Sequence, residues 1–405
     1  MTPWRVPYPK FGNGPGLERV ASIADRLGLD LASFGARGAV IVGSNGKGST
    51  AAMCAALLQQ IDFNTGLFTS PHLLDLNERF RIGGEDISDR ELERHWRRVS
   101  EAVERLGMAA HLGGFEFLFL IAADWFAARG CVHTVWEAGL GGRLDPVRLI
   151  EAQQLALTSL DLEHTALLGD SLEAIALEKI AAAPRGARLF VADAVTAGIR
   201  RVIEQFAAER EIALEYVQPF AAAAPLAGAH QQSNAGLALR LAQVFAPLSQ
   251  QQMETGFAAT HWPGRLEILS EAPLVVIDAG HTVSGVNAAL DGFQALCGGR
   301  RAVLVCGVSA DKDAAAIVSR LAPAFDAIIC VAARHKGAPT AMIASHARSA
   351  NPDAEIALAE SVADARRLAL VKAKAGAVYV AGGLFLAAEF KAVHLGRDPG
   401  SLVFF

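Results

Sequence analysis

The chain has 405 residues, of which 52% are hydrophobic, enough for two or three domains with sizeable cores. Its net charge of -5 gives no basic surface typical of nucleic-acid binding. No apolar stretch has the length and freedom from charge of a membrane span, and the first ten residues lack the apolar core of a signal peptide. The five cysteines are widely spaced, with no C-x-x-C pair, which predicts reduced thiols, a cytoplasmic protein and no zinc site.

The first predicted strand leads into a glycine-rich loop. Residues 39–42 are apolar and mostly β-branched, which is typical of a buried parallel strand. The loop contains Gly43, Gly46, Lys47 and Gly48, and the alanine-rich helix behind it opens with the hydroxyl residues Ser49 and Thr50. Such a loop directs backbone N–H groups, a lysine charge and a helix N-terminus toward an oxyanion.

The spacing of this loop differs from the general G-x-x-x-x-G-K-[ST] pattern. A glycine-rich turn with an exposed lysine is therefore the alternative interpretation. The strand before the loop and the helix after it favour a nucleoside triphosphate site, with Ser49 or Thr50 as a ligand of Mg²⁺.

Strands and helices alternate through the first two thirds of the chain. Helices are predicted at residues 15–28, 89–106 and 115–129, and an ordered loop at 71–88. Further strands are predicted at residues 65–70, 132–137, 155–160, 187–193 and 212–217. This alternation indicates a doubly wound, mostly parallel sheet.

The pattern restarts after residues 261–263, which predicts a domain boundary. Five more strands follow, at residues 274–280, 301–309, 327–333, 355–359 and 377–383. Helical segments lie between them, for example at 313–321 and 362–373. We expect a first domain at residues 1–262 and a smaller α/β domain at residues 263–405.

Polar residues follow successive predicted strands. They are Ser70, Glu137, His164 and, on the next helix, Lys179. The carboxyl ends of parallel strands meet at one edge of a sheet, so these side chains could surround a divalent cation whose remaining ligands are nucleotide oxygens. Each residue alone has an ordinary structural explanation, and only their joint placement favours a site.

The second half adds three candidates that could equally be structural. Arg265 follows a Pro-Gly pair and could be a surface arginine. Asp278 and His281 end the strand at 274–280, where a capped turn is the simpler interpretation.

The order of these motifs resembles folylpolyglutamate synthase and dihydrofolate synthase, within the wider Mur ligase superfamily. The similar segments span nearly the whole chain: GLERV, GSNGKGST, GLFTSPHL, NERFRI, FEFL, WEAGLGGRLD, LTSLDLEHTALLGDSLEAIALEK, LAGAHQQSNAGLAL, PGRLE and GVSADKD. The form GKGS with a following SPHL is similar to the folate branch, whereas ligases that build peptidoglycan typically carry GKTT. The resemblance implies a P-loop Mur-ligase-like central domain and a C-terminal Rossmann-like domain.

The resemblance also implies roles for individual residues. Those expected to contact ATP are Asn45, Gly46, Lys47, Gly48, Ser49, Thr50, Asn234, Arg265, Asp278 and His281. Those expected to hold two Mg²⁺ ions, with K⁺ as a further cation, are Ser49, Ser70, Glu137, His164 and Lys179. Lys47, Glu137, His164 and Lys179 form the implied catalytic set, in which Lys179 matches a lysine carbamylated by CO₂. Pro71, His72 and Asp145 match positions on the acceptor side.

The implied reaction is an ATP-dependent ligation in folate and one-carbon metabolism. ATP converts a folate-type carboxylate, of dihydropteroate or tetrahydrofolate, into an acyl phosphate, which the amine of glutamate attacks. The resemblance implies a monomer that acts on small molecules. The charge and hydropathy described above predict neither a nucleic-acid nor a membrane partner.

Three departures from the family pattern leave alternatives open. The chain has LGGRLDPVR where the family usually has LGGRLDATN. At residues 179–182 it has KIAA where KAGI is usual. It has DAGHT where DGAHN is usual, so that Thr282 replaces an asparagine. The nearest alternative is a paralogous ligase acting on another carboxylated cofactor precursor. A catalytically silent nucleotide-binding protein is a second alternative. The loop spacing and the second domain disfavour a P-loop transporter or motor.

Overall fold

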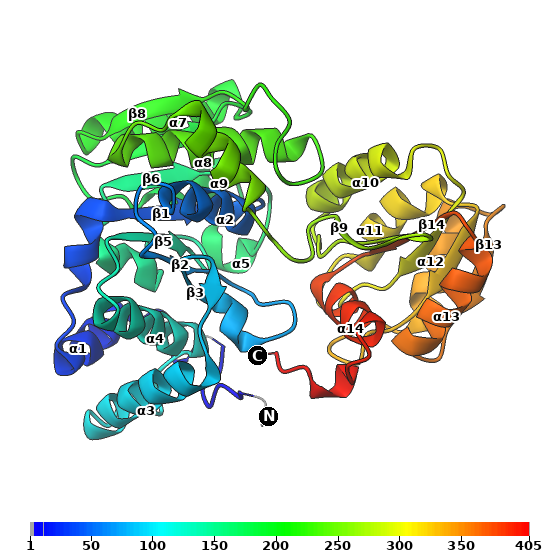
Figure 1. The fold of residues 1–405 in the computed structure, drawn as a ribbon, viewed down its shortest axis with the longest axis horizontal. Coiled ribbons are helices and arrows are strands. Elements are labelled where there is room, and N and C mark those ends of the chain that lie inside the picture. The colour runs from blue at the N-terminus through cyan, green and yellow to red at the C-terminus, as the bar shows by residue number, and fades with distance from the viewer. Residues whose placement is uncertain (1–3, 11, 405) are drawn as a thin grey trace.

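The computed structural model describes residues 4–10 and 12–404, which form two α/β units side by side (Figure 1). The first unit contains an eight-stranded sheet of order β4-β3-β2-β5-β1-β6-β7-β8, and the second a six-stranded sheet of order β13-β12-β11-β14-β10-β9. Residues 1–3, 11 and 405 lie outside the described residues. The predicted first domain begins, and the predicted second domain ends, among these residues.

The first sheet is parallel except at one edge. Its strands are β1 (Gly38–Val42), β2 (Thr65–Phe68), β3 (Phe80–Ile82), β4 (Glu85–Asp86), β5 (His133–Glu137), β6 (Gln154–Leu157), β7 (Arg188–Ala192) and β8 (Ala213–Val217). β3 and β4 are antiparallel and lie inside residues 71–88, where a loop was predicted. That prediction was wrong for these residues because strands of three and two residues are too short to show an alternating pattern.

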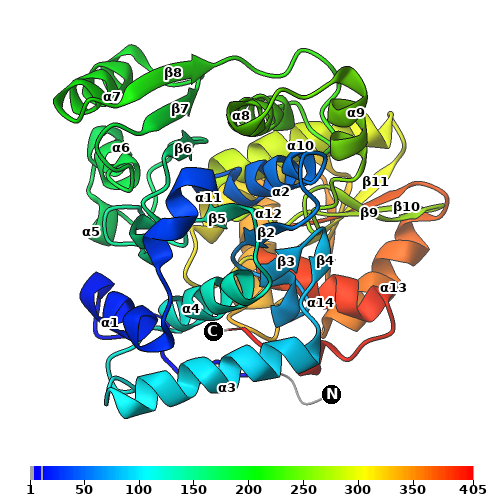
Figure 2. The same ribbon diagram turned by 60° about the vertical axis from the view of Figure 1, so that its left-hand side comes forward.

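Helices cover both faces of the first sheet (Figure 2). One face carries α2 (Lys47–Leu58), α8 (His230–Phe245) and α9 (Gln250–Ala258). The other side carries α1 (Leu17–Leu27), α3 (Asp89–Arg105), α4 (Gly114–Ala128), α6 (Leu172–Ile180) and α7 (Ala197–Glu209). Shorter helical segments are η1 (Leu31–Arg37), η2 (Leu76–Arg79), η3 (Pro146–Ile150) and α5 (Thr165–Leu168).

Strand β1 is buried on both faces, which explains why its sequence is apolar throughout. Val40 and Val42 point into the core beneath α1 and α4, whereas Ala39 and Ile41 point into the core beneath α2 and α8. Successive strand side chains alternate between faces, and here both faces are buried. The doubly wound α/β arrangement predicted from the sequence is confirmed.

The second unit is built in the same way. Its strands are β9 (Glu267–Glu271), β10 (Leu274–Ile277), β11 (Ala302–Cys306), β12 (Ala327–Cys330), β13 (Glu355–Leu358) and β14 (Ala377–Ala381). Its helices are α10 (Val283–Cys297), α11 (Ala314–Leu321) and α12 (Thr340–Ala350) on one face, α13 (Val362–Ala373) and α14 (Leu384–His394) on the other, and the short η4 (Ala322–Ala324) and η5 (Pro399–Ser401). The sequence did not predict β9, an antiparallel edge strand that is only partly buried.

Two features connect the units. The chain passes from α9 into β9, and after α14 it returns to the first unit, where its end lies beside the loop before β3 (Figures 1 and 2). All five cysteines are unpaired thiols, as predicted. Among the described residues, every helix is too short or too polar to cross a membrane.

Candidate active site

The phosphate loop is held against the end of β6. Ser44 N donates to the Ser159 carbonyl over 2.8 Å, Asn45 N to Ser159 Oγ over 2.9 Å, and Thr158 Oγ1 to the Asn45 carbonyl over 2.6 Å. Lys47 Nζ folds back onto the Gly43 carbonyl at 2.9 Å. These hydrogen bonds fix the loop against the sheet, with the N-terminus of a 12-residue helix behind it.

Two loop glycines allow close approach by the rest of the unit. A Cβ atom on Gly46 would lie 2.4 Å from Asn234 Oδ1, and one on Gly48 would lie 2.6 Å from the Trp262 ring. The Asn234 amide donates to Gln231 Oε1 over 2.8 Å, and Gln231 in turn lies 3.4 Å from Ser49 Oγ.

The predicted Asn234 thus lies directly on the loop. Sequence reasoning missed Gln231, although its position one turn before Asn234 on α8 is a signal. The buried Thr50 hydroxyl has no hydrogen-bond partner among the described residues.

We expect Gly46→Ala to weaken ATP binding by at least about tenfold. The residue has φ +84°, and a methyl group there would collide with the Asn234 side chain, so either the loop or Asn234 must shift. Isothermal titration with ATP would measure the effect. Gly186→Ala is the matched control, because Gly186 has φ +77° but open space around it, and its ATP affinity should stay at the wild-type value.

The carboxyl ends of β2 and β5 bring Ser70 and Glu137 together. These strands are parallel neighbours, and Glu137 Oε2 accepts the Ser70 N–H over 2.9 Å. Glu137 is buried, and burial raises its pKa, while the charges of Lys47 and Arg265 oppose that rise. A buried carboxylate under the influence of nearby positive charges is suited to an anion-rich, metal-dependent site.

Lys179 reaches the same edge from α6. It is 1% exposed, and its Nζ lies 3.0 Å from the Gly43 carbonyl and 2.9 Å from Glu163 Oε1. Burial and the nearby charge of Lys47 lower the pKa of Lys179, and Glu163 opposes this. Sequence reasoning missed Glu163, for which the only signal is its position beside His164.

The contacts of His164 support a role in the site less strongly than those of Glu137 and Lys179. It precedes α5 with φ +47° and is exposed on the surface, where partial burial lowers the pKa of its imidazole. Within the described residues no hydrogen bond or ion pair joins it to Glu137. Nor do three or more His, Cys, Asp or Glu side chains gather there as a metal cluster. The donors that do lie at the loop are hydroxyl and carboxylate oxygens, which fit a hard cation whose shell is completed by nucleotide oxygens.

The predicted acceptor-side residues Asp145 and His72 use their polar atoms within the protein. Asp145 accepts N–H groups from Gly139, Leu140 and Val147 over 2.9, 3.0 and 3.1 Å, and burial raises its pKa to about 6. Both ring nitrogens of His72 are also occupied, as described below. The exposed Pro71 lies beside it. Asp145 and His72 therefore hold neighbouring backbone and side chains in place in this structure.

The second unit contributes charged groups from the end of β10. Asp278 accepts N–H groups from Leu266 at 3.1 Å and Gly280 at 2.7 Å. Burial raises its pKa, and the positive charge of Arg265 opposes this rise as it does at Glu137. His281 Nδ1 donates to the Ala279 carbonyl over 3.3 Å. Arg265 thus lies within electrostatic reach of carboxylates from both units.

Hydrogen bonds connect the phosphate loop to the start of α10. Thr282 Oγ1 donates to Asn45 Oδ1 over 3.1 Å, and Asn45 Nδ2 donates to Ser284 Oγ over 3.2 Å. Ser284 Oγ also donates to Asp161. We call these four residues the interunit network. Thr282, which replaces the family's asparagine, also caps α10 by accepting the Gly285 N–H.

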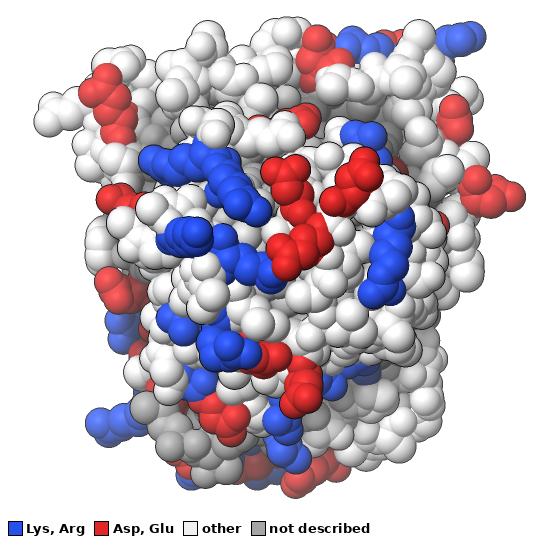
Figure 3. All heavy atoms as spheres, turned by 90° about the vertical axis from the view of Figure 1, so that its right-hand side faces the viewer, with Lys and Arg blue, Asp and Glu red and all other residues white. Residues whose placement is uncertain are grey.

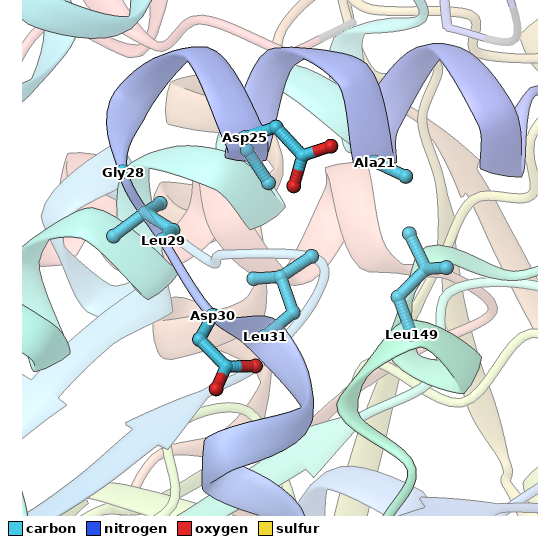
Figure 4. Close-up of a pocket in the computed structure, with 8 residues that line it drawn as sticks. Ala21, Asp25, Gly28, Leu29, Asp30, Leu31 and Leu149 are labelled. Carbon is cyan, nitrogen blue, oxygen red and sulfur yellow. The ribbon is translucent and has the colours of Figure 1, made fainter.

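A separate surface hollow lies between α1, η1 and η3 (Figure 4). None of the predicted site residues lines it. Its lining combines small and apolar residues with two aspartates: Ala21, Ala24, Asp25, Gly28, Leu29, Asp30, Leu31 and Leu149. The candidate site is therefore the edge between the two units.

Comparison with known proteins agrees with this site. Residues 264–384 match the family described as Mur ligase, glutamate ligase domain. The folylpolyglutamate synthase of Lacticaseibacillus casei is 31% identical over 323 residues, covering 72% of this chain and 75% of that protein. The chain belongs to the folylpolyglutamate synthase and dihydrofolate synthase family.

Solved structures of this family have the same fold. Mycobacterium tuberculosis folylpolyglutamate synthase, complexed with ADP and AMPPCP, aligns with a TM-score of 0.86 and 28% identity over 95% of this chain and 96% of that chain. A bifunctional folylpolyglutamate synthase/dihydrofolate synthase with Mn, AMPPNP and L-glutamate bound aligns with a TM-score of 0.82 and 26% identity, over 97% of this chain and 99% of that chain. The family and fold expected from the sequence motifs are confirmed.

Proposed function

We propose that this chain is an ATP-dependent ligase that joins L-glutamate to a folate-type carboxylate, releasing ADP and phosphate. The observation that carries the proposal is the placement of an ordered phosphate loop beside the Ser70–Glu137 pair, with Arg265 reaching the same edge from the second unit. Similarity to folylpolyglutamate synthases, including one with L-glutamate and a nucleotide bound, supports the substrates.

The residues present fit ATP and a divalent cation. The helix N-terminus and Lys47 would bind phosphate oxygens, and Ser49, Ser70 and Glu137 would hold Mg²⁺. When bound, Mg²⁺ neutralises charge on the transferring phosphoryl group. The acceptor carboxylate would take the γ-phosphoryl group of ATP, releasing ADP. The amine of glutamate would then attack this acyl phosphate, forming the amide bond, expelling phosphate and losing a proton.

Carbamylation of Lys179 is part of the proposal. The uncharged amine adds to CO₂, forming an N–C bond and losing a proton, and burial favours the uncharged amine by lowering the pKa of Lys179. The carbamate would then present an anionic oxygen to a second cation near His164. We include this second site and a K⁺ ion as further proposals.

We also propose the division at residues 262 and 263, since the match to the glutamate ligase domain begins at residue 264. We further propose that the protein is a cytoplasmic monomer that acts on small molecules and has no nucleic-acid or membrane partners. On the face of the second unit seen in Figure 3, acidic and basic side chains are interspersed, which supports a small-molecule enzyme rather than a nucleic-acid binder.

The proposal is tested with purified protein, ATP, Mg²⁺, L-glutamate and either dihydropteroate or tetrahydrofolate. We expect ADP formation together with a product heavier by one glutamate residue, measured by mass spectrometry. Turnover with dihydropteroate or with tetrahydrofolate would show which step the enzyme performs. Turnover only with a non-folate carboxylate would keep the ligase chemistry and reject the folate acceptor.

The interunit network predicts how tightly hydrolysis is coupled to ligation. An acyl phosphate is hydrolysed when water enters, so contacts that hold the two units closed protect it. We expect Ser284→Ala, which removes a hydroxyl between Asn45 and Asp161, to raise the ratio of ADP to ligated product by about three- to tenfold. Both products are measured in one reaction.

Two control variants differ from Ser284→Ala in only one respect each. Ser284→Thr keeps the hydroxyl and should retain the wild-type ratio. Ser319→Ala removes an exposed serine of α11 and should also leave it unchanged. A wild-type ratio in Ser284→Ala would contradict a role for the network in excluding water.

A further inference from the structure

The chain after α14 returns from the second unit and contacts the loop before β3 (Figures 1 and 2). We call residues 397–404 the return segment and residues 70–79 the acceptor loop. Arg397 makes two hydrogen bonds to Asp75, each 2.7 Å long, from Nη1 to Oδ2 and from Nη2 to Oδ1. A two-point arginine–carboxylate pair fixes orientation as well as distance.

A second contact of the return segment is to His72. The His72 ring is 3% exposed and stacks on Phe404, with ring centroids 5.6 Å apart and planes at 9°. Arg79 Nε donates to His72 Nδ1 over 2.9 Å, so that nitrogen is an acceptor. The proton is therefore on Nε2, which donates to the Val403 carbonyl over 2.8 Å.

These contacts make His72 a connector with no polar atom left for a ligand. A neutral imidazole has one donor and one acceptor, and here Val403 and Arg79 use both. Phe404 itself is held in the second unit, 4.9 Å from the Phe385 ring and 5.2 Å from the His335 ring. The imidazole thus transmits the position of the second unit to Arg79.

The rest of the acceptor loop is internally ordered. Glu78 accepts the N–H groups of Leu73, Leu74 and Asp75 over 2.8 to 2.9 Å. Arg79 is 5% exposed, and its charge acts on Glu137, the carboxylate that accepts the Ser70 N–H. The loop therefore behaves as one piece that begins and ends beside Glu137.

We propose that the return segment is a positioning element of the active site: through Asp75 and His72 it fixes the acceptor loop, and so sets the places of Ser70, Pro71 and Arg79 around Glu137. Arg397 and Phe404 are then positioning residues, because they act through the loop and touch no reacting atom. The effect on the acceptor substrate rests on the proposed function, whereas the ordering of the loop does not.

The proposal is tested with Phe404→Ala and Arg397→Ala in the full chain. Amide hydrogen exchange should rise by at least about tenfold within residues 70–79, while amides of β10 and β14 keep their wild-type protection. Arg397→Lys, which keeps the charge but loses the two-point geometry, should give an intermediate rise. Arg367→Ala is the matched control, because it breaks an exposed ion pair with Asp364 on α13, far along the chain from the return segment.

Kinetics then separate positioning from general damage. In an active enzyme both variants should raise KM for the acceptor by about five- to twentyfold, while KM for ATP at saturating Mg²⁺ stays within about twofold. Because Ser70 is a proposed Mg²⁺ ligand, both variants should also raise the Mg²⁺ concentration needed for half-maximal rate. Wild-type exchange of residues 70–79 in both variants would overturn the proposal, and so would an equal rise in Arg367→Ala. If exchange rises but the wild-type enzyme ligates no folate acceptor, the positioning role stands and the proposed function fails.

Discussion

Lys179→Ala is expected to lower kcat by about a thousandfold or more, because the change removes a buried group aimed at the phosphate loop. Its Nζ lies within 3.0 Å of the Gly43 carbonyl, on the same edge as Lys47 and Glu137. A nucleotide-binding protein without catalysis would keep its function after this change, whereas a ligase would lose turnover. Coupled ADP release and product mass would measure the loss, and ATP titration would show whether binding survives.

Chemical rescue identifies which form of Lys179 is active. If the carbamate is needed, small carboxylates such as formate or acetate should restore part of the activity of Lys179→Ala, and methylamine should not. Rescue by methylamine alone would show that the ammonium paired with Glu163 is the working form. Lys372→Ala serves as a control, because Lys372 pairs with Glu355 at an exposed position and its loss should change kcat little.

Glu137→Gln is expected to lower kcat by about a hundred- to a thousandfold and to raise the Mg²⁺ concentration needed for half-maximal rate. The amide has the shape of the carboxylate and can still accept the Ser70 N–H, so the fold should persist. What it lacks is the negative charge that a cation needs. Initial rates over a Mg²⁺ series would separate this effect from a general loss of structure.

Glu116→Gln is a suitable control for that experiment. Glu116, in the first turn of α4, is also a buried carboxylate that accepts a backbone N–H, from Gly113, but its ion-pair partner is Arg19 on α1. Its variant should lose stability without altering the Mg²⁺ response. An unchanged Mg²⁺ requirement in Glu137→Gln would remove Glu137 from the metal site.

Local pattern was sufficient for the fold class and for the phosphate loop. β1 is buried on both faces and reads as an uninterrupted apolar run, and the glycines at positions 46 and 48 are required by close neighbours. The meeting of Ser70 with Glu137 also followed from the sequence, because parallel neighbouring strands end at the same edge. Such features depend on periodicity or on short motifs, which one segment carries by itself.

Other features had no signal in any single segment. The edge strands β3, β4 and β9 are too short or too exposed to show a pattern, and they form because a neighbouring strand offers its backbone groups. Glu163 could be read as an ordinary acidic residue after a strand, and only the fold shows that it pairs with Lys179.

The sequence by itself therefore determined the family, the α/β architecture and the loop that would bind phosphate. Tertiary structure alone decided how the two units meet. Asn45 and Ser284 are 239 positions apart, and His72 and Val403 are 331 apart, so no local period links them. Their contacts depend on how the two sheets are placed against each other, and each pair becomes visible only when both partners are placed in space.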